Sequence, residues 1–227
     1  MKTFLQGATG RLGQEIVIMA KSLDLNLVPL KRDESVSDVA EPLHIIDVSH
    51  PEGTKSLVKG LMSRPNSFLK GIVIGTTGFQ ESQKEELQAF SELFPVCLAP
   101  NFSLGVLFLR SLFQGETASG KKKCNLWKEF GLQAKMTETH HIHKKDAPSG
   151  TAKLFMKDLG ITEVTSKRIG ETFGVHEIVF SSEREEIKIS HETFDRSIYA
   201  EGAIKTIQAF ETRRFAPGLY ELSDIIL

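Results

Sequence analysis

The sequence predicts an α/β protein in which a doubly wound parallel sheet is joined to a second, α+β domain with an open mixed or antiparallel sheet. Three observations carry this prediction. Short β-like runs alternate with amphipathic helical windows over the first hundred residues, as in parallel sheets with crossover helices. A glycine-rich turn follows the first of these runs. Longer runs of alternating polar and apolar residues lie in the second half of the chain.

The pattern of apolar residues in the first half of the chain predicts strands separated by helices. The apolar residues Ile45 and Ile46 suit a strand that is buried on both faces. Pro51 suits the first turn of a helix, and Leu87 and Phe90 lie on one apolar stripe of another. We therefore expect strands at residues 3–6, 26–30, 43–47, 71–74 and 96–99, with helices at residues 11–23, 51–62 and 82–94.

The pattern changes after Pro100. Ser103 can cap a helix over residues 104–114, and Ser149 precedes a helical window. The alternating runs are separated by a polar, hairpin-like break at residues 181–184. We expect helices at residues 104–114, 151–159 and 197–210, and antiparallel strands at residues 175–180 and 186–191.

The composition excludes several classes of function. The 227 residues carry 28 Lys and Arg against 29 Asp and Glu, so no basic excess is present to bind nucleic acid or an anionic membrane. The longest apolar runs are far shorter than the roughly twenty residues of a membrane helix, and no signal-peptide apolar region follows Lys2. Cys97 and Cys124 share no metal-ligand or redox spacing. We expect a cytoplasmic protein whose partner is a small molecule.

A glycine-rich segment follows the first expected strand and opens the first expected helix. Glycines at this turn let the backbone approach a pyrophosphate, whose charge faces the helix N-terminus. The alternative is a glycine-rich turn without a ligand, which the flanking strand and helix disfavour. The segment consists of Gly7, Ala8, Thr9, Gly10, Arg11, Leu12 and Gly13, and we expect its first six residues to bind a dinucleotide.

The end of the second expected strand bears on the choice of dinucleotide. An acidic residue there binds the ribose 2′-hydroxyl of NAD, whereas a basic group accommodates the 2′-phosphate of NADP. This chain has Lys31 and Arg32 before Asp33, which favours NADPH over NADH. A solvated run of charges is the alternative interpretation.

Two further loops follow expected buried strands. Ligands of doubly wound sheets bind at the carboxyl ends of the strands, so both loops should lie at one edge. Their hydroxyl, amide and backbone groups could bind the nicotinamide carboxamide, although ordinary turns have the same composition. The residues are Gly75, Thr76 and Thr77 in one loop, and Ala99, Pro100, Asn101 and Phe102 in the other.

The densest group of reactive side chains lies at residues 138–152. Three histidines, His140, His141 and His143, are followed by Lys144 and Lys145. A solvent-facing polar loop is one interpretation. A zinc site is another, but this histidine spacing fits no standard zinc pattern and neither cysteine is near, so we expect no metal. A histidine general acid beside a lysine, acting on an anionic substrate, is the third.

A candidate anion site follows directly. Ser149, Gly150 and Thr151 open the expected helix after Pro148. The free amides of a helix N-terminus, its dipole and two hydroxyl groups suit a carboxylate. Together with the histidines and lysines, this helix start predicts a substrate that carries carboxylate groups.

These segments resemble the 4-hydroxy-tetrahydrodipicolinate reductase family, also called dihydrodipicolinate reductase. The most specific match is the run of residues 140–152, and residues 7–13, 47–54, 75–79, 99–103 and 168–176 agree with it in order. The resemblance implies a Rossmann-like dinucleotide-binding domain made of residues 1–103 and 197–227. It also implies a substrate-binding and oligomerisation domain made of residues 104–196, in a homotetramer.

The resemblance also implies residue roles and an activity. His140 matches the acid/base residue, Lys144 its proton-donating or electrostatic partner, and His141, Gly150 and Thr151 the substrate carboxylate site. Lys31 stands where the family often has an acidic residue, which strengthens the expectation of NADPH. The implied reaction is the NAD(P)H-dependent reduction of 4-hydroxy-tetrahydrodipicolinate to tetrahydrodipicolinate, with loss of water, in the diaminopimelate route to lysine. A reductase of another carboxylated substrate and a catalytically silent dinucleotide-binding regulator are the alternatives.

Overall fold

The chain forms two compact units. The structure is a computed structural model that describes residues 2–30, 43–63 and 68–227. Unit 1 consists of Met1–Phe102 and Ser197–Leu227, and unit 2 of Ser103–Arg196. Lys31 and Arg32, the residues expected at the cofactor 2′-phosphate, lie outside the described residues. None of the helices in the described ranges is long and apolar enough to cross a membrane.

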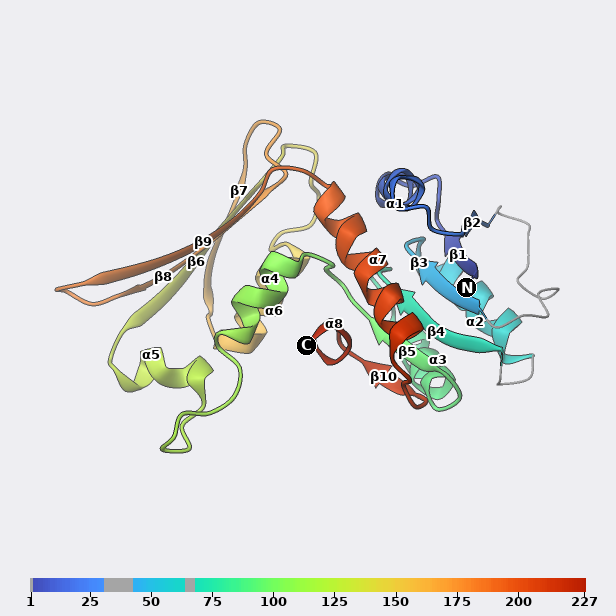
Figure 1. Cartoon of the computed structure of the whole chain (residues 1–227). Helices are drawn as coiled ribbons and strands as arrows, with labels where there is room; N and C mark the ends of the chain where they lie inside the picture. The colour runs from blue at the N-terminus through green and yellow to red at the C-terminus, as the bar shows by residue number, and fades with distance from the viewer. Residues whose placement is uncertain (1, 31–42, 64–67) are drawn as a thin grey trace. The chain divides into compact units, whose positions relative to one another are not determined.

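Unit 1 contains a parallel sheet of six strands within the described residues (Figure 1). Every neighbouring pair is parallel, in the order β10-β5-β4-β3-β1-β2. The doubly wound parallel sheet predicted from the sequence is therefore confirmed. The short edge strand β10 was not predicted. The strands are β1 (Lys2–Gln6), β2 (Leu27–Pro29), β3 (Leu43–Asp47), β4 (Leu69–Ile74), β5 (Pro95–Leu98) and β10 (Gly218–Tyr220).

Helices cover both faces of this sheet. Side chains alternate between the faces of a strand, and in β4 Ile72 and Ile74 pack into the main core cluster with Leu87 and other residues of α2 and α3. Gly71 points to the other face, where an added Cβ atom would lie 2.5 Å from the ring of Phe210 in α7. The helices are α1 (Arg11–Ser22), α2 (Pro51–Met62), α3 (Glu81–Ser91), α7 (Ser197–Thr212) and α8 (Leu222–Ile226).

Unit 2 contains a four-stranded mixed sheet in the order β7-β6-β8-β9. The strands β6 and β7 are parallel, whereas the pairs β6–β8 and β8–β9 are antiparallel. The expected mixed or antiparallel sheet is confirmed, although β6 and β7 were not predicted as individual strands. The strands are β6 (Gln133–His140), β7 (Glu163–Arg168), β8 (Gly174–Ser181) and β9 (Glu186–Thr193).

Two helices pack on one face of this second sheet (Figure 1). Leu109 of α4 (Leu104–Ser111) and Phe155 of α6 (Gly150–Leu159) join Met136 and Ile178 of the strands in one apolar cluster. A short 3-10 turn, η2 (Lys123–Asn125), leads into α5 (Leu126–Glu129). The helix expected over residues 104–114 ends at Ser111, three residues early. The helix expected from Thr151 begins one residue earlier because Ser149 is its N-cap.

Candidate active site

The glycine-rich loop between β1 and α1 is tightly folded. Gly7 has φ of 86°, and an added Cβ atom would lie 2.6 Å from the carbonyl oxygen of Val48. A Cβ atom on Gly13 would lie 2.1 Å from the carbonyl oxygen of Gly7. Both positions therefore need glycine, the first for its conformation and the second for close contact between the loop and the helix.

The backbone amides at the N-terminus of α1 have neither a capping side chain nor an acidic residue beside them. Gly10 is the N-cap, so no side chain caps the helix, and the first turn contains no acidic residue. Arg11, the first helical residue, is exposed. Free backbone amides with a basic side chain beside them suit a phosphate group.

The two other expected cofactor loops follow the carboxyl ends of β4, which pairs with β3, and of β5, which pairs with β4. Gly75 donates its N–H to the carbonyl of Asp47 at 2.8 Å, and a Cβ atom on Gly75 would lie 2.4 Å from the ring of Phe102. Thr76, Ala99 and Phe102 are buried. The structure therefore brings together the three predicted loops at the carboxyl ends of parallel strands, as doubly wound ligand sites require. These loops carry Gly7, Ala8, Thr9, Gly10, Arg11, Leu12, Gly75, Thr76, Thr77, Ala99, Pro100, Asn101 and Phe102.

Asp47 lies at the end of β3, and its side chain holds the backbone there by hydrogen bonds. The sequence did not indicate this role. Its buried carboxylate accepts hydrogen bonds from the Ser49 N–H at 3.0 Å, the Ser49 hydroxyl at 2.6 Å and the Thr54 hydroxyl. Burial raises the pKa of Asp47, against the lowering effect of these hydrogen bonds. The network fixes the end of β3 against the start of α2.

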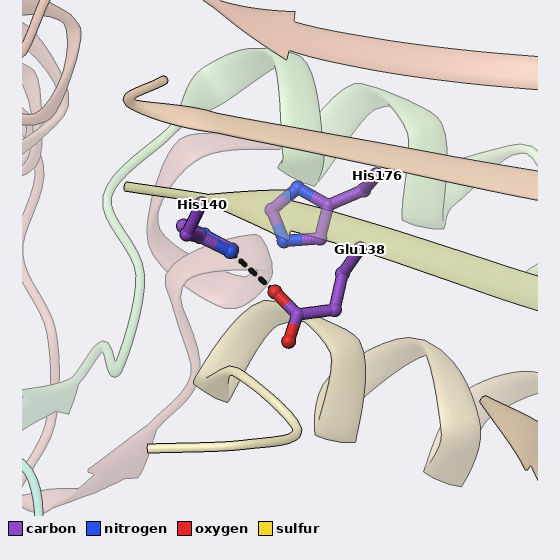
Figure 2. Close-up of side chains that lie close together, drawn as sticks. All are labelled: Glu138, His140 and His176. Carbon is purple, nitrogen blue, oxygen red and sulfur yellow. Dashed lines mark hydrogen bonds and ion pairs between the residues drawn. The ribbon is translucent and has the colours of Figure 1, made fainter. Parts of the chain in front are cut away.

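In unit 2, His140 ends β6 as a buried side chain (Figure 2). Its Nδ1 is hydrogen-bonded to Oε2 of Glu138, which is fully buried two residues earlier on the same face of the strand. The other carboxylate oxygen of Glu138, Oε1, lies 2.9 Å from an Arg168 guanidinium nitrogen. Both oxygens of Glu138 thus have a positively charged or hydrogen-bonding partner.

The charges around His140 act in opposite directions. Burial lowers the pKa of His140, Glu138 raises it, and the cationic side chains Lys144 and Arg168 lower it further. The net effect is a pKa below the ordinary histidine value. Burial raises the pKa of Glu138, but its hydrogen bonds with Arg168 and Ser166 and the charges of His140 and Arg168 together outweigh burial, so that pKa is lowered. Glu138 therefore remains a carboxylate beside His140.

His176 connects His140 to the start of α6. It lies on β8 directly opposite Glu138, and its ring centroid is 5.1 Å from that of His140 (Figure 2). Its Nε2 lies 3.2 Å from the hydroxyl of Ser149. Burial lowers the pKa of His176 to about 3, so it is a neutral imidazole at physiological pH.

The residues of the predicted anion site lie together at the start of α6. Ser149 is the N-cap of α6, and its hydroxyl accepts a hydrogen bond from the Ala152 N–H at 3.2 Å. Gly150 is exposed, and an added Cβ atom there would meet no heavy atom within 4 Å. Thr151 is buried in the first turn. The first turn contains no acidic residue, so the helix N-terminus keeps its positive potential.

Lys144 and His141 lie on the loop between β6 and α6. The Lys144 ammonium pairs with the Asp146 carboxylate at 2.8 Å. Burial raises the pKa of Asp146, but the hydrogen bond and charge of Lys144, a backbone hydrogen bond and the charge of Arg168 together lower it. His141 is half-buried, with its ring centroid 6.1 Å from that of the exposed His143. This loop therefore carries Lys144, predicted as a catalytic residue, and His141, predicted as a substrate-binding residue.

Sequence reasoning assigned no role to Glu138, Arg168 or His176. Glu138 alternates with His140, so a predicted strand would have placed both on one face. The pairing of β6 with β7 and β8, which brings Arg168 and His176 to that face, has no signal in a single sequence.

The buried acid–histidine group could also hold a cation. Ligand atoms of Glu138, His140 and His176 lie within 4.8 Å of one another, and in the described ranges no other such group of His, Cys, Asp and Glu occurs. Only His140 belongs both to this group and to the histidine run discussed above. Arg168 places a positive charge on Glu138, which opposes a second cation. The group therefore suits a hydrogen-bonded proton donor better than a metal centre.

Family models of dihydrodipicolinate reductase match nearly the whole chain. The N-terminal model covers residues 1–102 and the C-terminal model residues 121–226. The chain belongs to the dihydrodipicolinate reductase family. The N-terminal model ends at residue 102, where the first segment of unit 1 ends, and the C-terminal model covers most of unit 2 together with residues 197–226 of unit 1.

Relatives of the same family match over nearly their full length. The 4-hydroxy-tetrahydrodipicolinate reductase of Bdellovibrio bacteriovorus is 32% identical over 236 residues, which cover 100% of this chain and 96% of the relative. The 4-hydroxy-tetrahydrodipicolinate reductase of Pelagibacter ubique is 30% identical over 264 residues, which cover 98% of this chain and 96% of the relative.

Solved structures show the same fold. A dipicolinate-bound dihydrodipicolinate reductase from Paenisporosarcina sp. TG-14 matches with a TM-score of 0.72 at 19% identity, over 99% of both chains. Aspartate dehydrogenase from Thermotoga maritima matches with a TM-score of 0.52 at 11% identity, over 95% of this chain and 99% of that one. This chain therefore shares its fold with an aspartate dehydrogenase as well.

Proposed function

We propose that this chain is a 4-hydroxy-tetrahydrodipicolinate reductase, an oxidoreductase that forms tetrahydrodipicolinate and water in the diaminopimelate route to lysine. The observation that carries the proposal is the link from His140 through His176 to Ser149. It joins a candidate acid to a candidate carboxylate site in a member of the dihydrodipicolinate reductase family. A silent dinucleotide-binding protein would have no use for this group.

Unit 1 is proposed to bind the pyridine nucleotide. Two observations support this. The amides at the start of α1 have no side-chain cap, and the loops that follow the parallel strands lie at the same end of the sheet. The nicotinamide supplies a hydride when bound. We expect NADPH to be preferred, with Lys31 and Arg32 near the 2′-phosphate.

Unit 2 is proposed to bind the substrate and to form the contacts of a homotetramer. Ser149, Gly150 and Thr151 bind a carboxylate at the start of α6, and His141 and Lys144 add positive or hydrogen-bonding groups. Within the described chain, Lys144 pairs with Asp146, so a substrate carboxylate would exchange for that partner. The cytoplasm is the expected compartment.

His140 is proposed as the general acid. Hydride addition to a conjugated ring leaves an electron-rich centre, which must accept a proton. Glu138 raises the pKa of His140 against the effect of burial and so favours its protonated form, and Lys144 would stabilise negative charge nearby.

The test is an assay of the purified protein with the product of dihydrodipicolinate synthase. Oxidation of NADPH, followed by its absorbance, should depend on this substrate and yield tetrahydrodipicolinate. NADPH oxidation with another carboxylated imine, but none with this product, would assign a different substrate. Cofactor binding without turnover of any such compound would instead indicate a silent dinucleotide-binding protein.

A further inference from the structure

We propose that Glu138 is a positioning residue that holds a proton on Nδ1 of His140, so that Nε2 is the atom that exchanges protons with the substrate. Arg168 completes the arrangement by holding the Glu138 carboxylate. The proposal rests on the proposed role of His140 in the reduction.

The two oxygens of Glu138 have different partners. Oε2 is hydrogen-bonded to Nδ1 of His140, and Oε1 lies 2.9 Å from a guanidinium nitrogen of Arg168. A carboxylate accepts hydrogen bonds and has no proton to donate, so Nδ1 must be the donor in this pair. The neutral imidazole then carries its lone pair on Nε2, and the protonated imidazole presents an N–H there.

Arg168 is itself fixed by the loop that follows β6. Its Nε donates to the carbonyl oxygen of Lys144 at 3.2 Å, and a terminal nitrogen donates to the carbonyl of Asp146 at 2.5 Å. One guanidinium thus holds both the carboxylate behind His140 and the backbone that carries Lys144. A lysine at this position would lack the planar fork that makes these contacts together.

The Nε2 side of the ring lies beside a residue without a side chain. A Cβ atom on Gly174 would lie 3.0 Å from Nε2 of His140, closer than ordinary contacts. The backbone of Gly174 is not in the left-handed region, so alanine is possible there without backbone strain. Because Gly174 has no side chain, it leaves space beside Nε2 of His140, the atom proposed to exchange protons with the substrate.

The first measurement needs no variant. Long-range nitrogen–proton NMR of histidine-labelled protein identifies which ring nitrogen of neutral His140 carries the proton. We expect Nδ1–H in the wild type. Nε2–H would overturn the proposal whether or not the chain turns over substrate. The inactivity of the wild type would overturn only the proposed function, and the NMR result would still decide the position of the proton.

The second measurement uses Glu138→Gln, which keeps the shape and replaces one oxygen with a donor. The amide can donate to Nδ1 and stabilise the Nε2–H form. We expect kcat to fall by at least about tenfold, with the KM for substrate and the Kd for NADPH within about twofold of wild type. In the NMR measurement, the Nε2–H form should increase.

Glu177→Gln is the matched control, because Glu177 is the neighbour of His176 in β8 and its partly exposed side chain points to the opposite face of the sheet. It should retain wild-type kcat and the wild-type His140 tautomer. Arg168→Lys should lower kcat less than Glu138→Gln. If Glu138→Gln retains wild-type kcat and Nδ1–H, Glu138 has no positioning role. Stoichiometric metal in the purified protein, with a metal-dependent His140 signal, would replace the proposal with a cation site.

Discussion

His176 Nε2 lies 3.2 Å from the hydroxyl of Ser149, so a buried imidazole of the sheet is hydrogen-bonded to the N-cap of α6. The same pairing occurs at α4, whose N-cap Ser103 has its hydroxyl 3.3 Å from Nε2 of His191 in β9. Two helices of unit 2 are thus fixed at their N-termini by histidines of neighbouring strands. Because β8 pairs with β6, the contact with His176 places the start of α6 beside the strand that ends at His140.

The first prediction concerns the proposed acid. His140→Ala should lower kcat by at least about a hundredfold because a positioned general acid contributes about 10²–10⁴ in rate. NADPH binding, followed by fluorescence titration, should be unchanged because His140 belongs to unit 2. The predicted loss is in kcat, since the acid acts mainly in the transition state.

Lys144→Ala is expected to differ from His140→Ala in substrate binding. An ammonium beside a carboxylate stabilises the bound substrate as well as the transition state, so KM should rise while kcat falls. If both variants keep the wild-type kcat and KM, neither His140 nor Lys144 takes part in the reaction.

A second prediction tests the start of α6. Thr151→Ala should raise the substrate KM and leave the Kd for NADPH nearly unchanged, because the start of α6 is proposed to bind the dicarboxylate and not the cofactor. Steady-state kinetics with both substrates varied gives the two constants. Lys153→Ala, an exposed change in the same helix, is the control and should leave KM unaltered. An unaltered KM in Thr151→Ala would place the carboxylate elsewhere.

Much of unit 1 could be predicted from its sequence because buried parallel strands are continuous apolar runs and their helices have apolar stripes. β6 gave no such signal. Its buried side chains are Met136, Glu138 and His140, so two of these three are polar. The residues that complete the site, Arg168 and His176, come from strands that pair with β6 only in the folded chain.

The third prediction concerns cofactor choice. If Lys31 and Arg32 accommodate the 2′-phosphate, the wild type should have a higher kcat/KM with NADPH than with NADH. Arg32→Ala should narrow that difference by about tenfold, the effect of one partly exposed charged contact of about 1–2 kcal/mol. The ratio of the two kcat/KM values is the measurement. Equal use of both cofactors by the wild type would contradict the interpretation.

A fourth prediction separates acid catalysis from metal catalysis. Chelator treatment should leave the reductase rate unchanged, and His143→Ala should be far less harmful than His140→Ala, because His143 is an exposed loop residue outside the buried acid–histidine group. Metal analysis of the purified protein accompanies the assay. A rate that falls with chelator and recovers with zinc would overturn the assignment of His140 as an acid.

The last prediction is a dependence of stability on pH that comes from His44. This side chain is fully buried in β3, with Nδ1 3.8 Å from a carboxylate oxygen of Glu211. Burial lowers the pKa of His44 from 6.5 to about 4. Between these values the unfolded chain binds a proton that the folded chain does not. Acidification through this range therefore favours the unfolded state, and the free energy of unfolding falls as the pH falls.

His44→Leu should remove this contribution. The free energy of unfolding lost between pH 7 and pH 5 should be smaller in the variant by about 1–2 kcal/mol, measured by urea denaturation at both values. The dependence should be reduced and not abolished, because burial lowers the pKa of His176 to about 3 and acts with the same sign. His50→Asn, a change at the exposed N-cap of α2, is the control and should keep the wild-type dependence. An equal loss of stability in wild type and His44→Leu would show that His44 becomes protonated in the folded state as readily as in the unfolded chain.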